Sequence, residues 1–129
     1  MVIGSRLSDL NEVRNFLDEI FTESDLDRNY FNRVLLGLSE AVNNSILHGN
    51  GLDTEKSVFI TARYDLESLI FDVVDQGDGF DVSKILDPTS DSNIRKERGR
   101  GIFLIRHFAD DVVFFEEGRR VRIKYILHK

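Results

Sequence analysis

The final stretch of the chain carries the pattern that most limits its possible folds. Four large apolar residues alternate there with four others, three of them cationic: Val121, Ile123, Tyr125 and Leu127 against Arg120, Arg122, Lys124 and Ile126. Alternation with a period of two is typical of a β-strand that buries one face and leaves the other mostly solvated. The pattern therefore predicts an antiparallel sheet with one covered side.

Three further segments predict strands because they are rich in β-branched and aromatic residues. They span residues 57–64, 68–75 and 111–117, and a short strand is expected at residues 2–3. The connections at Asp65–Glu67 and Glu117–Gly118 are short enough to make two hairpins.

Helices are predicted where apolar residues recur every three or four positions. The first runs from Asp9 to about Phe21, with Ser8 or Asp9 as its cap and Glu12 in its first turn. The others span residues 27–48 and 101 to 108 or 109, with a short helix at 81–86. The order α-α-β-β-loop-α-β-β predicts one α+β domain over residues 1–129, a two-layer α/β sandwich with helices on one face of a mainly antiparallel sheet.

Composition and charge exclude several classes of function. The 129 residues include no cysteine, which excludes disulfides, thiolate nucleophiles and cysteine zinc sites. A net charge of −6 argues against binding to the nucleic-acid backbone. The N-terminus lacks the pattern of a signal peptide, and no apolar run approaches the roughly 18 residues that span a bilayer. We therefore expect a soluble cytoplasmic protein with no membrane and no direct nucleic-acid partner.

The segment SEAVNNSILHGN, residues 39–50, places an acid and two amides inside the second predicted helix. On a helical wheel the core stripe consists of Val34, Leu35, Leu38, Val42 and Ile46. Glu40 and Asn44 are four residues apart, so they project together on the opposite side. That side is either a solvated back face or the wall of a partly closed pocket.

Two observations favour the pocket. Leu36 and Leu47 flank the polar pair, and a helix that is apolar on both sides is usually enclosed on both sides. Asn43 and Asn44 are poor helix formers with no evident structural purpose there. In a pocket, the Glu40 carboxylate and the Asn44 amide oxygen suit a base or a hard cation such as Mg²⁺.

The segment DQGDGFD, residues 75–81, follows a predicted strand. By alternation Asp75 shares the core-facing row of that strand, where an acid needs a hydrogen-bond donor. A purine amino group is one such donor. The alternative is a plain Asx turn in which Gly77 and Gly79 supply positive φ.

The segment RGRGIFLI places Gly99 and Gly101 at the predicted start of the third main helix, behind several basic residues. Backbone amides at a helix N-terminus attract anions, and glycines let a phosphate approach closely. The alternative is a glycine-rich hinge beside a solvated run of charge. The polar stretch before it is expected to be mobile.

The motifs EAVNN with HGN, DQGDG and RGRGIFLI resemble, in order, the N, G1 and G2 boxes of the GHKL ATP-binding fold. Within that superfamily the chain is most similar to bacterial anti-sigma-factor serine/threonine kinases of partner-switching systems. SRLSDLNEVRNFL and FADDVVF are also typical of these kinases, so the resemblance covers nearly the whole chain.

The resemblance implies ATP and Mg²⁺ as cofactors and assigns roles to individual residues. Glu40 would be the general base, Asn44 the Mg²⁺ ligand with Asn43 beside it, and Asp75 the acceptor for the adenine amino group. Gly77 and Gly79 would leave space for the base. Gly99, Arg100 and Gly101 would contact the phosphates, and Arg98 would also bind the cofactor. Residues 83–98 would form an ATP lid.

Three functions compete on this basis. The first is a kinase that phosphorylates a small anti-anti-sigma-like protein; the resemblance also admits a sigma factor as a second partner and a homodimer. The second is a nucleotide-binding module that sequesters a partner without transferring phosphate. The third, the ATP domain of a histidine kinase, is disfavoured because no separate helical hairpin carries a phosphoacceptor histidine. His48 is expected only to interact with a helix dipole, and the apolar group Phe103, Leu104 and Phe108 is expected to be core.

Overall fold

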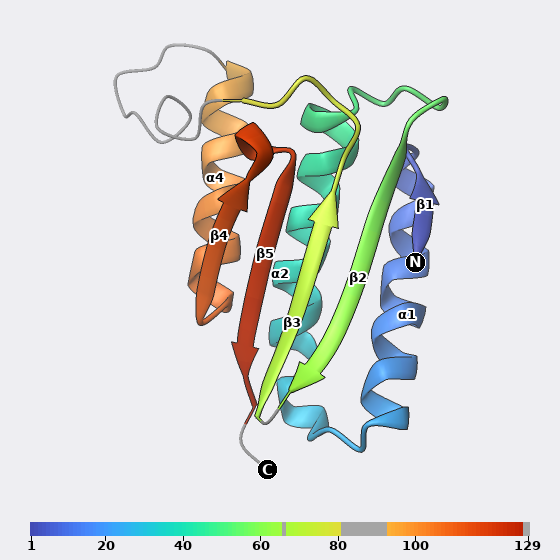
Figure 1. Cartoon of the computed structure of the whole chain (residues 1–129), viewed down its shortest axis with the longest axis vertical. Coiled ribbons are helices and arrows are strands. Elements are labelled where there is room, and N and C mark those ends of the chain that lie inside the picture. Colours follow the sequence, from blue (N-terminus) through green and yellow to red (C-terminus); the bar gives the residue numbers. More distant parts are fainter. Residues whose placement is uncertain (66, 81–92, 128–129) are drawn as a thin grey trace.

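Helices cover one face of a five-stranded sheet in the computed structural model, which describes residues 1–65, 67–80 and 93–127. Helices α1 (Leu10–Glu23), α2 (Phe31–Asn44) and α4 (Asn93–Phe108) lie behind the sheet in Figure 1. The predicted α+β sandwich is therefore confirmed. No helix in the described part of the chain is long and apolar enough to cross a membrane.

The sheet has the order β1-β2-β3-β5-β4, and every neighbouring pair is antiparallel. Its strands are β1 (Val2–Gly4), β2 (Ser57–Asp65), β3 (Ser68–Val74), β4 (Asp111–Phe115) and β5 (Arg120–Ile126). Both predicted hairpins and the short first strand are present. Because β5 lies between β3 and β4, the end of β3 and the β4–β5 turn meet at one edge of the molecule (Figure 1).

The core lies between the sheet and the helices, where the alternation predicted it. In the strands it contains Val58, Ile60, Leu69, Phe71, Val73, Val121, Ile123 and Tyr125. The predicted stripe of α2 meets this row, with Val34, Leu38, Val42 and Ile46 fully buried. Each such side chain contributes about 1.5–3 kcal/mol by leaving water.

The uncovered face of the sheet carries an ion cluster. Asp72 of β3 accepts two hydrogen bonds from Arg122, at 2.8 and 3.0 Å, and one from Arg120 at 2.5 Å. The hydrogen bond from Arg122, followed by the hydrogen bond and charge of Arg120, lowers the pKa of Asp72 to about 2, although burial acts in the opposite direction. The cluster therefore links β3 to β5 most strongly above that pH.

The ends of the first two helices differ in detail from the prediction. Asp9 lies at the N-terminus of α1, but its carboxylate accepts from Arg6 N at 3.2 Å instead of capping α1 with Glu12. Before α2, Asp27 caps a short 3₁₀ turn by accepting from Asn29 N at 2.9 Å. After α2 the chain continues through a π-helical turn over Ser45–Gly49, a geometry that is frequent at functional sites.

The start of α4 was predicted wrongly. The helix begins at Asn93 rather than Gly101, because the good helix formers at residues 95–98 extend it backward through both glycines. The segment expected as a lid is thus helical in its backbone over residues 93–98. Residues 83–92, and the short helix predicted at 81–86, lie outside the described residues.

The apolar group predicted as core on α4 is also wrong in part. Phe103 is 68% exposed and Leu104 is 38% exposed, whereas Ile102 and Ile105 are buried. Successive helix residues are about 100° apart, so only the positions three apart at 102 and 105 face the sheet. Phe103 instead points outward and stacks on His107, with ring centroids 6.4 Å apart.

Candidate functional site

One small cavity brings the three sequence motifs together. It lies between the end of α2, the residue after β3 and the middle of α4, and its volume is about 20 Å³. Asn44, Asp75 and Ile102 line it, one from each motif, together with Phe80, Phe114 and Gly118. The predicted convergence of residues that lie far apart in the sequence is therefore a property of the fold.

Asp75 lies at the inner end of this cavity and is only 5% exposed. Its Oδ1 accepts a hydrogen bond from Gly77 N at 2.9 Å, and its own N–H donates to Arg119 O at 3.0 Å. The Asx turn considered as an alternative is therefore present, although of its two glycines only Gly79 has a positive φ, of 81°. It does not compete with a binding role, because it fixes the orientation of the carboxylate that lines the cavity.

Two glycines permit the close approach of backbone to this carboxylate. A Cβ at Gly49 would overlap the Asp75 carboxylate, and a Cβ at Gly77 would overlap the carbonyl oxygen of Gly49. The π-helical turn and the loop after β3 thus touch through their backbones. The second predicted helix ended at residue 48 and Gly49 was assigned no role in the site; the HGN triplet was the available signal for this contact.

Asn50 is a further residue whose role the sequence did not reveal. It is 3% exposed, and its Nδ2 donates to Ser5 Oγ and to Ser57 O, each at 3.0 Å. Its Oδ1 accepts from Gln76 N at 2.8 Å. These bonds hold the loop that follows Asp75 to the start of β2, so Asn50 positions the inner wall of the site.

Asn44 and Glu40 occupy different surroundings although they share one side of α2. The Asn44 amide lies against the backbone of Gly101 in α4, where an added Cβ would come within 2.8 Å of Nδ2. Glu40 is half-buried one turn earlier and does not line the cavity. Burial raises the pKa of Glu40, so its carboxylate accepts a proton more readily than that of an exposed glutamate.

The inference that α2 is enclosed on both sides holds only in part. Leu47 is half-buried, but Leu36 is 50% exposed. Asn43, beside Asn44, is half-buried. The enclosed part of the back face is therefore its C-terminal end, where α4 packs against it.

The predicted phosphate segment is not at a helix N-terminus. Gly99, Arg100 and Gly101 lie inside α4, where N–H groups are bonded to carbonyls four residues earlier. The arrangement expected from a helix start is thus wrong for the described conformation. Arg100 is exposed, Gly101 is buried against Asn44, and Arg98 belongs to α4 with its side chain outside the described part.

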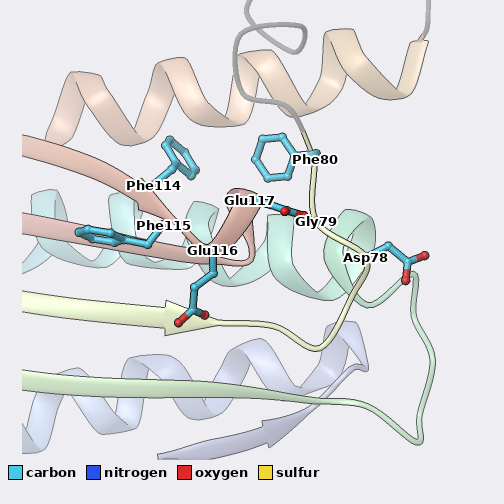
Figure 2. Close-up of a pocket in the computed structure, with 8 residues that line it drawn as sticks. Asp78, Gly79, Phe80, Phe114, Phe115, Glu116 and Glu117 are labelled. Atoms are coloured by element: carbon cyan, nitrogen blue, oxygen red, sulfur yellow. The ribbon is translucent and has the colours of Figure 1, made fainter.

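Gly79 does not line the small cavity. It lines an adjacent open cavity of about 570 Å³, together with Asp78, Phe80 and the β4–β5 turn (Figure 2). The predicted residues therefore divide between two neighbouring spaces. Asn44 and Asp75 line the inner one, Gly79 the outer one, and Gly77 supports the wall from behind.

The donor set suits a nucleotide and a hard cation. A buried carboxylate at the end of a mostly apolar cavity can orient a ligand amino group, and amide and carboxylate oxygens are the ligands that Mg²⁺ prefers. Among the described residues no group of three acidic or histidine side chains could hold a metal alone. Mg²⁺ at Asn44 would therefore need phosphate oxygens to complete its coordination, as is usual for this ion.

The comparison with known families agrees with this geometry. The family model of the histidine kinase-like ATPase domain matches residues 3–125. The chain belongs to this family of GHKL-type, ATP-binding and kinase-like domains. A search of curated proteins gave no match.

Proposed function

We propose that the chain is an ATP-dependent serine/threonine protein kinase and anti-sigma-type regulator, whose substrate is a small anti-anti-sigma-like protein. The observation that carries the proposal is the meeting of Asn44, Asp75 and α4 at one cavity, with Glu40 one turn from Asn44. Family membership supports the ATP-binding part. The resemblance of the three motifs and of both chain ends to anti-sigma-factor kinases supports the choice of substrate.

Each residue has a definite task in this proposal. Asp75 accepts a hydrogen bond from the adenine amino group while the Gly77 N–H fixes its orientation. The amide oxygen of Asn44 holds Mg²⁺. Glu40 takes the proton of the attacking hydroxyl group, for which its raised pKa is suited. Bound Mg-ATP supplies the phosphoryl group and the metal charge that stabilises its transfer.

The experiment that tests the kinase compares variants on one verified partner, a small protein that is encoded beside this chain and binds it. Glu40→Gln keeps size and hydrogen-bonding reach, so it should bind Mg-ATP within a few-fold of wild type. It should transfer phosphate about 10² to 10⁴ times more slowly, the usual contribution of a positioned base. Asn44→Ala should weaken both binding and transfer.

Glu19→Gln is the matched control, because Glu19 is an exposed acid in the middle of α1, away from the cavity. It should leave both readouts unchanged. A wild-type protein that binds Mg-ATP and the partner but never phosphorylates it would replace the kinase by the second candidate, a nucleotide-binding module that sequesters its partner. Transfer by Glu40→Gln at the wild-type rate would remove Glu40 from the role of base.

A further inference from the structure

Two aromatic rings separate the inner cavity from the outer one. Phe80 and Phe114 line both the 20 Å³ space that contains Asp75 and the open 570 Å³ space beside it. Their rings meet edge to face, with centroids 5.9 Å apart and an interplanar angle of 78°. Figure 2 shows the two rings next to each other, while the carboxylates of Asp78 and Glu116 point away from them. The ring pair, Phe80 with Phe114, is thus a partition.

The inner cavity is too small for the ligand that its lining residues suit. A space of about 20 Å³ has room for about one water molecule, whereas small-molecule sites measure roughly 300–1,000 Å³. A purine does not fit the cavity that Asp75 lines in this conformation. The outer cavity has the necessary volume but does not include Asp75. Among the described residues, Phe80, Phe114 and Gly118 line both spaces, so a base in the outer cavity would reach Asp75 if the two spaces joined at the ring pair.

The β4–β5 turn holds the backbone of Phe80 and packs closely against one side of its ring. Phe80 N donates to Glu117 O at 2.7 Å, and the Phe80 ring lies directly over Gly118. A Cβ at Gly118 would come within 2.6 Å of ring carbons Cδ1 and Cε1. Glu116, Glu117 and Gly118 all have positive φ, of 54°, 57° and 84°, so this close fit is maintained by a strained turn.

Phe80 has an obvious direction in which to move. Its ring borders the outer cavity, and its backbone bond to Glu117 can persist during rotation about the side-chain bonds. Separating the rings gives up the edge-to-face contact with Phe114, which is of modest strength. Phe114 lies on a strand and is packed against the core, which leaves Phe80 as the mobile partner.

We propose that the Phe80 ring is a gate that closes the base pocket against Phe114 and must swing into the outer cavity before adenine reaches Asp75. This inference rests on the proposed nucleotide function of the same site. The gate makes nucleotide affinity and association rate depend on the fraction of molecules in which the ring pair is open. It also makes Phe80 a positioning residue that none of the three motif assignments includes.

The test measures association of a fluorescent ADP, carrying a methylanthraniloyl group on its ribose, by stopped-flow. Phe80→Ala removes the gate and should associate about ten times faster than wild type. Phe114→Leu keeps apolar bulk but removes the opposing ring, and should also accelerate association. Phe103→Ala, a change at a 68% exposed phenylalanine on the outer side of α4, should match wild type. Equal rates for wild type, Phe80→Ala and Phe114→Leu would overturn the gate.

A second readout follows the ring itself and does not depend on turnover. The chain contains no tryptophan, so Phe80→Trp introduces a single reporter at the gate. Saturating ADP should shift its emission to the red as the indole leaves the inner pocket for the open cavity. An unchanged spectrum, with ADP binding verified by calorimetry, would overturn the gate and leave the proposed function intact. Absence of ADP binding by both wild type and Phe80→Ala would overturn the proposed function, and the gate with it.

Discussion

Replacing Asp75 by asparagine isolates the hydrogen bond that we propose Asp75 accepts from adenine. The asparagine Oδ1 can still accept the hydrogen bond from Gly77 N, which measures 2.9 Å in the wild type, so the Asx turn should survive. The amide nitrogen then takes the place of the second carboxylate oxygen. A donor would face the donor group of adenine in a site where the wild-type side chain is 5% exposed. The substitution therefore changes hydrogen-bond polarity with little change in shape.

The expected loss follows from that mismatch. Leaving a buried donor without an acceptor costs about 1–3 kcal/mol, which corresponds to a decrease in ATP affinity of about 5- to 150-fold. Isothermal titration calorimetry with ATP and with ADP should show the same factor for both, because the lost contact is to the base. The melting temperature without ligand should change little.

Asp78→Asn is the matched control, since Asp78 is an exposed acid in the same loop. It should bind both nucleotides as wild type does. Unchanged ATP affinity in Asp75→Asn would refute the role given to Asp75. An equal loss in Asp78→Asn would show that the effect is one of loop charge and not of a specific hydrogen bond.

Three further outcomes are expected. Gly77→Ala should lower the free energy of unfolding by about 1–3 kcal/mol in urea titrations, because its methyl group would overlap the carbonyl of Gly49; wild-type stability would contradict this. Asp72→Asn should cost about 1–2 kcal/mol at pH 7, with allowance for the partial exposure of its arginine partners. Since the pKa of Asp72 is lowered to about 2 in the folded state, this difference should persist above pH 4 and disappear as the pH falls toward 2. Because burial raises the pKa of Glu40, the phosphotransfer rate should increase with pH, with a midpoint above the pKa of an ordinary glutamate. Glu40→Gln should abolish this increase. Since it removes a half-buried charge, Glu40→Gln should also be the more stable protein at neutral pH.

The layers of the fold were predictable because they depend on local periodicity. The alternation in β5 and the stripe along α2 each place a row of side chains on one face, and burial then decides which face is inside. The start of α4 was not predictable in this way. Glycines at 99 and 101 resemble a helix boundary, but both lie inside α4, where the small size of Gly101 lets it pack against Asn44.

Only part of the candidate site could be predicted from local sequence patterns. Asp75 stood out as an acid in an apolar row and Asn44 as a poor helix former inside a helix, and both line one cavity. Gly49, Asn50 and Phe80 act through contacts between segments far apart in the chain, and no local pattern records such contacts. Phe103 shows the opposite error, because an apolar residue in a helix was taken as buried without regard to its direction.

Backbone amide shifts of the nine glycines test most directly whether one nucleotide site is formed by these motifs. Titration of ¹⁵N-labelled protein with Mg²⁺ and a non-hydrolysable ATP analogue should move the resonances of Gly77, Gly79 and Gly101. Gly77 N donates to Asp75, Gly79 lines the outer cavity and Gly101 lies against Asn44. Gly4, at the end of β1, should not move. Unchanged Gly77 and Gly79 resonances at saturation, or the largest shift at Gly4, would contradict the account.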